Sequence, residues 1–226
     1  MNNSVTFADK AIKYFTGLKN YCKEIENVQI INPYKSQEVR RIVREFFKKF
    51  FNDDNERIFI IGINPGRFGG GLTGITFTDP VALRESCGIK NNLGNRRELS
   101  SRFFYTLIDF YGGTEKFYSR FFLTALFPFA LICNGKNYNY YDSKSLAENL
   151  RNDIYLNIKK QISFGARNDL AIVLGKKNAE YFSQLNNKHN FFKKIIVLEH
   201  PRYIMQYKLK HQSTYLTKYL SSLNNY

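Results

Sequence analysis

The chain has 226 residues, of which 43% are apolar and 16% aromatic, a composition that excludes an intrinsically disordered protein. Lys and Arg total 34 against 19 Asp and Glu, and the resulting net charge of +15 favours a polyanionic partner, nucleic acid above all. A proteome that is basic throughout is the alternative explanation of this charge. The length, without repeats or linkers, predicts one domain over residues 1–226.

Cysteine usage and the N-terminal residues bear on the compartment. Cys22, Cys87 and Cys133 are far apart and share no C-x-x-C spacing, which argues against a metal site or a disulfide framework and favours a reducing compartment. The N-terminus lacks the apolar segment of a signal peptide, and no apolar run approaches membrane-spanning length. We therefore predict a soluble cytoplasmic protein, without metal or cofactor.

Apolar residues at helical spacing predict two helices within residues 1–52, which we assign to the same domain as the rest of the chain. The first has an apolar stripe of Ile12, Phe15, Leu18, Cys22 and Ile25. The second follows Ser36, a favourable N-cap, and buries Val39, Ile42, Val43, Phe46, Phe47 and Phe50. Its opposite side is rich in Arg and Lys, and we interpret these cations as a solvated face rather than a DNA-binding helix.

The remaining chain alternates apolar runs with helical patterns. Branched and aromatic residues predict buried strands at 58–61, 121–127, 169–174 and 195–199. Helical spacing predicts helices at 81–87, 99–110, 145–162, 176–185 and 208–223, whereas residues 91–97 and 134–142 are predicted to be loops. Strands that alternate with helices imply parallel pairing with right-handed crossovers. The predicted fold is an α/β three-layer sandwich, a central four-stranded parallel sheet flanked by helices.

Polar groups gather at the carboxyl ends of these strands, where open parallel sheets bind ligands. Asn64 lies in a glycine-rich turn after the first strand, and His200 directly follows the fourth. Thr124 and Ala125 belong to the second strand, while Gly175, Lys176 and Lys177 follow the third. A lone histidine at a strand end is often structural, but its joint placement with Asn64 at the strand ends favours a functional one.

The same segments argue against several chemistries. They contain no carboxylate pair of the glycosidase kind, no serine at a nucleophile elbow and no P-loop spacing. An amide, an imidazole, backbone N–H groups and an aromatic ring are what they do contain. Such a set suits a reaction in which the leaving group departs readily and the attacking water only has to be positioned.

Two segments resemble a known family. GINPGRFGGGLTGITF, residues 62–77, resembles the first motif of the SMUG-type (single-strand-selective monofunctional) uracil-DNA glycosylases, GMNPGPFG followed by TGVPF. HPRY, residues 200–203, resembles the second motif of the uracil-DNA glycosylase superfamily, in which His-Pro follows a strand. SSRFFYTLIDFYGG and FFLTALFPFAL between them resemble its middle section. The resemblance covers about residues 56–223.

The resemblance implies the uracil-DNA glycosylase fold and hydrolysis of the N-glycosidic bond of a deaminated base that is flipped out of the DNA. It implies that Asn64 positions the attacking water, that Phe77 stacks on the base and that His200 stabilises negative charge on the departing base. The remaining substrate-binding positions that it implies are Gly62, Ile63, Pro65, Gly66, Phe68, Thr124 and Ala125. Because the motifs contain no lysine nucleophile, the implied product is an intact strand with an abasic site. The implied partner is DNA, single- or double-stranded, bound by a monomer without a cofactor.

The chain departs from the family pattern at the position that reads the base. Ala125 stands where SMUG enzymes carry an Asn, and the loss of such a reader removes ~1–3 kcal/mol of discrimination. We therefore expect relaxed selectivity, with hypoxanthine and xanthine as further substrates beside uracil. Thr124 or Asn134 are candidates to compensate in part. A damage-binding module that has lost turnover is the alternative function, and a nucleotide-binding enzyme that uses the glycine-rich turn is a third.

Several residues are candidate DNA contacts. Arg67 replaces a family Pro and is assigned to a phosphate, and Lys176 and Lys177 lie at a predicted helix N-terminus, a natural phosphate seat. The segment after His-Pro also departs from the family, which has Ser-Pro-Arg there. Of its residues, Arg202 is a candidate DNA contact, and Ile204 and Met205 are either a wedge that fills the gap left by the flipped base or core contacts.

Overall fold

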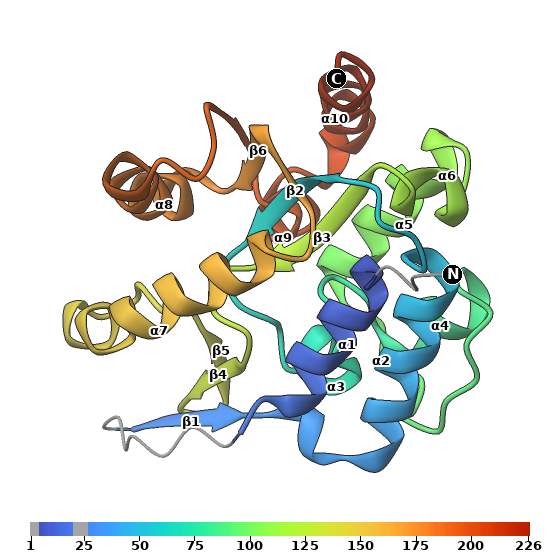
Figure 1. The fold of residues 1–226 in the computed structure, drawn as a ribbon, viewed down its shortest axis with the longest axis horizontal. Coiled ribbons are helices and arrows are strands. Elements are labelled where there is room, and N and C mark those ends of the chain that lie inside the picture. Colours follow the sequence, from blue (N-terminus) through green and yellow to red (C-terminus); the bar gives the residue numbers. More distant parts are fainter. Residues whose placement is uncertain (1–4, 20–26) are drawn as a thin grey trace.

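The computed structural model describes residues 5–19 and 27–226 (Figure 1). In chain order its elements are α1 (Phe7–Gly17), β1 (Val28–Ile31), η1 (Pro33–Lys35), α2 (Gln37–Phe50), β2 (Arg57–Gly62), α3 (Gly70–Thr73), α4 (Pro80–Glu85), α5 (Leu99–Tyr111), α6 (Thr114–Tyr118), β3 (Phe121–Ala125), β4 (Ala130–Cys133), β5 (Lys136–Tyr138), α7 (Lys144–Ile162), β6 (Ala166–Leu174), α8 (Lys176–His189), β7 (Lys194–Leu198), α9 (Pro201–Tyr207), η2 (Leu209–His211) and α10 (Gln212–Asn224).

The central sheet has four strands in the order β3-β2-β6-β7, and every neighbouring pair is parallel. Helices flank this sheet, with α1 and α2 packed side by side and α8 in contact with β6 and β7 (Figure 1). The predicted fold class is confirmed. The four predicted strands correspond to β2, β3, β6 and β7. The four apolar runs of the sequence therefore form the central sheet.

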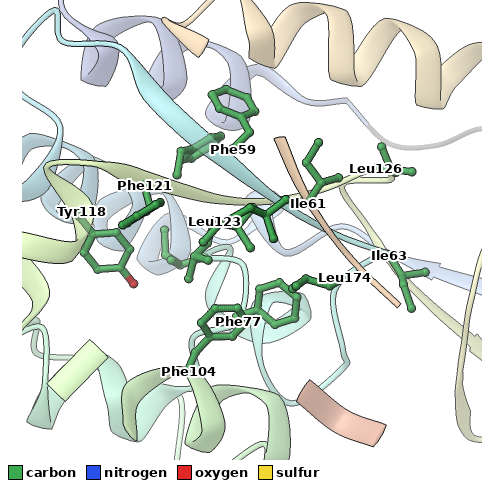
Figure 2. Close-up of a cluster of buried hydrophobic side chains, with 14 of the residues drawn as sticks. Phe59, Ile61, Ile63, Phe77, Phe104, Tyr118, Phe121, Leu123, Leu126 and Leu174 are labelled. Atoms are coloured by element: carbon green, nitrogen blue, oxygen red, sulfur yellow. The ribbon is translucent and has the colours of Figure 1, made fainter. Parts of the chain in front are cut away.

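The central strand β2 is buried along its whole length, as a parallel strand covered on both faces must be. Figure 2 shows its two sides: Phe59 points to one, and Phe77 and Phe104 pack together on the other. Buried side chains from Phe7 to Leu223 form a single hydrophobic cluster. Helix α1 joins this cluster through the Phe7 ring, whose centroid lies 5.1 Å from that of the Phe122 ring.

A second, three-stranded antiparallel sheet, in the order β1-β4-β5, was not predicted. The prediction of a loop over residues 134–142 was wrong, because β5 lies within it. The hairpin turn is made by Asn134 and Gly135, whose φ angles are 48° and 69°. Asn-Gly is the residue pair that tolerates such angles in a two-residue hairpin, and this signal was present in the sequence.

The predicted helices differ from the observed ones mainly at their ends. Helix α1 ends at Gly17, so Leu18 lies outside it, while Cys22 and Ile25 lie outside the described residues. Helix α2 follows Ser36, whose Oγ accepts a hydrogen bond from the Val39 N–H at 3.4 Å, and it buries all six predicted residues. The single helix predicted over residues 208–223 is α10, preceded by η2 and by a further helix, α9, that Pro201 begins.

Within the part of the chain that the structure describes, none of the helices is both long enough and apolar enough to cross a membrane.

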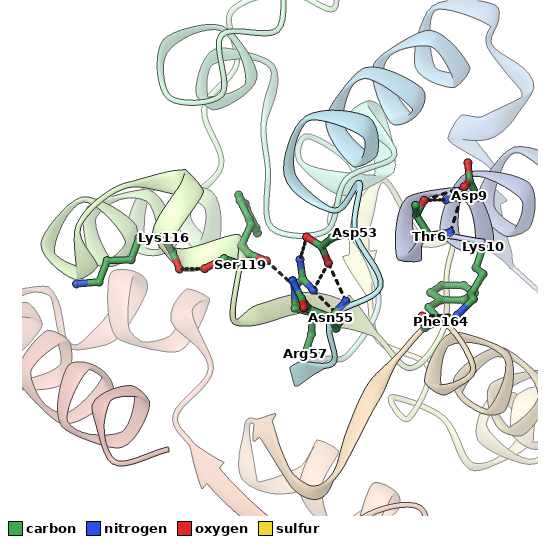
Figure 3. Close-up of polar contacts among 10 residues, drawn as sticks. Thr6, Asp9, Lys10, Asp53, Asn55, Arg57, Lys116, Ser119 and Phe164 are labelled. Atoms are coloured by element: carbon green, nitrogen blue, oxygen red, sulfur yellow. Dashed lines mark hydrogen bonds and ion pairs between the residues drawn. The ribbon is translucent and has the colours of Figure 1, made fainter. Parts of the chain in front are cut away.

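A buried cation lies at the start of β2 (Figure 3). The Arg57 side chain is fully buried, and its two terminal nitrogens donate to Asp53 Oδ1 and Oδ2 at 2.7 and 2.8 Å. Its Nε donates to the Tyr118 carbonyl at 2.9 Å, which ties β2 to the end of α6. Hydrogen bonding to Arg57 lowers the pKa of Asp53, so the stabilisation is present at neutral pH and is lost as the pH falls through the lowered pKa.

We expect Asp53→Ala to lower the free energy of unfolding by about 3 kcal/mol, because it leaves a buried guanidinium without its counter-charge. This value is at the low end for a broken buried pair, since the Asp53 side chain is itself 37% exposed. Urea unfolding at neutral pH measures the change. The control is Glu45→Ala, which breaks the exposed Arg41–Glu45 pair and should cost less than about 1 kcal/mol. Equal effects of the two substitutions would contradict the structural role of Arg57.

Candidate active site

A pocket lies at the carboxyl ends of β2, β3 and β7. The sequence-predicted residues that line it are Ile63, Asn64, Pro65, Gly66, Phe77, Ala125, His200 and Arg202. The wall also contains residues that the sequence analysis did not single out, namely Thr76, Glu98, Ser100, Asn137, Tyr138 and Asn139. The structure therefore brings Asn64 and His200, which are far apart in the chain, to one cavity.

The Asn64 side chain is held by the small antiparallel sheet and the segment after it. Its Nδ2 donates to the Tyr138 carbonyl at 3.0 Å, and its Oδ1 accepts from the Tyr140 N–H at 3.1 Å. Tyr140 is fixed in turn, because its hydroxyl donates to Asn178 Oδ1 at 2.9 Å. These bonds determine which end of the amide is the oxygen. One lone pair of Oδ1 and one N–H of Nδ2 are left for a ligand.

Phe77 forms an apolar wall of the pocket in a strained backbone conformation. Its φ is 57°, a left-handed value that is costly for a bulky residue. The ring packs on Phe104 at 4.7 Å between centroids. It also lies against β2, where a Cβ on Gly62 would be 2.5 Å from Phe77 Cζ. Strain that surrounding packing maintains at a pocket is typical of functional positions.

His200 is the N-cap of α9, and its Nδ1 accepts a hydrogen bond from the Arg202 N–H at 3.2 Å. A nitrogen that accepts carries no proton, so the neutral imidazole has its proton on Nε2 and can donate from there. Burial, with a further contribution from the charge of Arg202, lowers the pKa of His200 to about 4. The group is therefore a neutral hydrogen-bond donor at physiological pH.

Glu98 is a carboxylate that the sequence analysis did not assign to the site. It lies at the N-terminus of α5, where its N–H donates to Asp79 Oδ2 at 2.9 Å. Burial raises its pKa to about 7; the charge of Arg202 opposes this shift, and that of Asp79 adds to it. Glu98 belongs to neither motif. It lies between the polar segment predicted as a loop and the helix that follows, and nothing in that local sequence indicates that it reaches the pocket.

The structure corrects some of the predicted substrate contacts. Thr124 is buried and its hydroxyl donates to Gln161 on α7, because side chains alternate along β3 and this one points away from the pocket. Gly62 lies beneath the Phe77 ring rather than in the wall. Phe68 lines an adjoining hollow, and Asn134 is in the hairpin turn. Asn137 and Asn139 provide amides in the wall instead.

The structure decides between the two interpretations of Ile204 and Met205, a wedge or core contacts. Ile204 is fully buried and Met205 is 7% exposed, because this face of α9 packs on α5, so both are core contacts. The exposed residue beside them is Tyr203, at 43%.

The predicted phosphate contacts lie around the pocket rather than in it. Arg67 stacks on Phe68, with Arg96 on the same ring, at 4.5 and 4.3 Å from its centroid. Lys176 and Lys177 are exposed at the N-terminus of α8, as predicted. Within residues 5–19 and 27–226, no group of His, Cys, Asp and Glu side chains is arranged to hold a metal ion.

The architecture and the pocket are those of an enzyme that acts at the carboxyl edge of an α/β sheet. A model of the uracil DNA glycosylase superfamily matches residues 48–224, and the chain therefore belongs to this superfamily. The crystal structure of wild-type SMUG2 from Pedobacter heparinus is similar over 99% of this chain and 100% of that chain, with a TM-score of 0.93 and 40% sequence identity. No curated protein matches the chain.

The predicted resemblance to the SMUG type is confirmed. The enzyme is a monofunctional DNA glycosylase of DNA base-excision repair, and its substrate is DNA.

We expect Gly62→Ala to lower the single-turnover rate of base excision at least tenfold, because the added methyl displaces the Phe77 ring. Gly17→Ala is the matched control, since a Cβ at that position meets nothing within 4 Å. The rates are measured on a uracil-containing oligonucleotide, with thermal unfolding of each variant to separate loss of the site from loss of the fold. A Gly62→Ala enzyme as fast as the control would show that the position of Phe77 does not matter.

Proposed function

We propose that this enzyme excises uracil and the deaminated purines hypoxanthine and xanthine from DNA, after the nucleotide has been flipped into the pocket described above. The observation that carries the proposal is that Asn64, Phe77 and His200 line one pocket. The proposal includes action as a monomer in the cytoplasm, at the nucleoid.

Asn64 is proposed to orient the attacking water. The Tyr138 and Tyr140 backbone groups hold its amide, so Oδ1 presents a fixed lone pair to a water hydrogen. An amide cannot remove a proton, and the water therefore adds to a sugar carbon that has already developed positive charge. Such positioning accelerates the reaction, because the water has already lost its orientational freedom before the transition state forms.

His200 is proposed to stabilise the departing base. Its Nε2–H donates to an acceptor on the base, and the negative charge that grows there as the N-glycosidic bond breaks strengthens this hydrogen bond. A neutral imidazole serves this role without a proton transfer. The low pKa of His200 supports it, because no acid is needed to maintain the donor between about pH 6 and 8. The Phe77 ring supplies the stacking surface for the base.

The wall around Ala125 supports a broad choice of base. Ala125 has no polar side-chain atom, and its carbonyl accepts from Asn157 Nδ2 at 3.1 Å, so it is engaged with α7. Thr124 does not replace the missing amide, as its hydroxyl is bound to Gln161. The amides of Asn137 and Asn139 come from the β5 side of the pocket. An apolar position at the base edge admits bases that differ in their edge groups.

DNA is proposed to cross the basic rim of this pocket. Lys176, Lys177, Arg67 and Arg202 provide its positive charge, and the exposed Tyr203 is the side chain of α9 placed to fill the gap that the flipped nucleotide leaves.

Asn64→Ala and His200→Ala are each expected to lower the single-turnover excision of uracil by about 100-fold or more, since each removes a positioned polar group. The assay follows alkali-dependent scission of a uracil-containing single-stranded oligonucleotide. Asn187→Ala and His189→Ala, on α8 away from the pocket, are the controls and should retain the wild-type rate. Tight DNA binding by a wild-type protein that excises no base would favour the damage-binding module.

Lys176→Ala/Lys177→Ala is expected to weaken DNA binding and to reduce the slope of log affinity against log salt by roughly 1.4 on single-stranded DNA, at about 0.7 for each phosphate that is no longer neutralised. Fluorescence anisotropy at several salt concentrations measures the slope. Arg44→Ala/Lys48→Ala removes the same charge from α2 and should leave the slope nearly unchanged. If both pairs reduced the slope equally, the N-terminus of α8 would have no special part in DNA binding.

A further inference from the structure

Glu98 is a carboxyl group in the pocket wall that has no part in the mechanism proposed above. It lines the same cavity as Asn64, Phe77 and His200 and also borders the adjoining hollow around Phe68. Among the described residues its carboxyl makes no hydrogen bond and no ion pair, although its backbone N–H is bound to Asp79. Glu98 is half-buried, and a carboxyl group that opens into a ligand cavity without a protein partner is a candidate for a role in the reaction.

Two glycines make room for this carboxyl. A Cβ on Gly66 would lie less than 3.0 Å from Glu98 Oε1, and a Cβ on Gly69 would lie less than 3.0 Å from Oε2. Gly66 does not have a positive φ, so it is the space taken by the Glu98 carboxyl that excludes a side chain at position 66. The carboxyl thus occupies the space that a side chain at position 66 would fill, next to the segment that the motif places beside the base.

The charges around Glu98 come from several elements. Asp79 begins α4, Arg202 lies in α9 beside His200, Arg67 follows β2, Arg97 immediately precedes Glu98, and Lys136 begins β5. Burial outweighs the opposing charge of Arg202 and raises the pKa of Glu98 to about 7. Near neutral pH, a substantial fraction of the enzyme therefore carries a protonated Glu98 that can give up its proton.

Pyrimidines and purines differ in the groups that they carry on the base edge away from His200. Gly66, Phe77 and His200 line one pocket, and the space beside Gly66 is filled by the Glu98 carboxyl, so for a base stacked on Phe77 with one edge at His200 we place the opposite edge at Glu98. In uracil that edge carries only carbon-bound hydrogens. In hypoxanthine and xanthine it carries N7, a ring nitrogen with a lone pair, and the adjacent carbonyl oxygen at position 6 is a second acceptor.

We propose that Glu98 is a further catalytic residue of this site, the general acid that protonates N7 of deaminated purines; the inference rests on the function proposed above. The Glu98 proton passes to N7 while the bond between N9 and the sugar C1′ breaks, and the bonding electron pair stays with the base, which leaves as a neutral purine. The water held by Asn64 forms the new bond to C1′ and releases a proton to solvent. Glu98, left as a carboxylate, takes a proton from solvent before the next turnover.

The test compares uracil and hypoxanthine in oligonucleotides that are otherwise identical. Single-turnover rates are measured for wild type and Glu98→Gln, which keeps the shape of the side chain and cannot transfer a proton. We expect the ratio of the hypoxanthine rate to the uracil rate to fall about tenfold or more, because general acid catalysis typically contributes 10²–10⁴-fold. Glu45→Gln removes an exposed carboxylate that pairs with Arg41 on α2, and this charge-matched control should leave the ratio unchanged.

Two further measurements separate proton transfer from a structural role. The wild-type hypoxanthine rate should fall as the pH rises above about 7, where Glu98 loses its proton, whereas the Glu98→Gln rate should be flat across that range. Imidazolium, a small acid whose pKa lies near the neutral range, should restore part of the hypoxanthine rate to Glu98→Ala by serving as an external acid.

The outcomes distinguish the two proposals. Equal losses on uracil and hypoxanthine in Glu98→Gln, or the same pH profile as wild type, would overturn the role of Glu98 as an acid. A wild-type enzyme that excises uracil and neither purine would overturn it as well, while leaving the uracil activity intact. Excision of no base at all would instead refute the proposed function.

Discussion

The site depends on three glycines at and after the end of β2, because the positions where their side chains would lie are occupied by other groups. The backbone of Gly62 lets the Phe77 ring lie against the strand, with only 2.5 Å between Cζ and the position of a Cβ. Gly66 and Gly69 leave room in the same way for the Glu98 carboxyl. The Phe77 ring and the Glu98 carboxyl therefore both pack directly against glycine backbone. A side chain at any of the three positions would displace the ring or the carboxyl.

The small antiparallel sheet has a clear structural purpose in this arrangement. It continues from the carboxyl end of β3 and brings the Tyr138 and Tyr140 backbone groups to both ends of the Asn64 amide. Asn178 extends this support, because it accepts from the Tyr140 hydroxyl and donates to the carbonyls of Ile61 and Leu174 in two central strands. Preorganisation of this kind lets a neutral amide act on a water molecule without rearrangement during the reaction. The neutral, Nε2-protonated His200 is the counterpart on the other side of the pocket.

Differences between the predicted and observed site follow from two physical rules. Side chains alternate along a strand, so Thr124 and Ala125 could not both face the pocket. The register of β3 directs Ala125 toward the pocket and Thr124 away from it. A helix buries one face, so Ile204 and Met205 enter the core while Tyr203 is exposed. Sequence proximity to a motif did not distinguish these cases. Asn137 and Asn139 reached the site through a hairpin whose Asn-Gly turn is readable in the sequence, but whose destination is not.

The sequence by itself determined the four central strands, the α/β fold class, the glycine-rich turn and the strand ends at which Asn64 and His200 lie. It could do so because apolar periodicity and glycine content report local conformation, and because parallel strands carry their ends to one edge. Only the tertiary structure decided which groups complete the pocket. Glu98 enters from the start of α5, and its environment depends on Gly66, Asp79 and Arg202, which are distant in the chain. Burial and proximity of this kind set the protonation of Glu98 and His200, and they arise only when separate segments pack together.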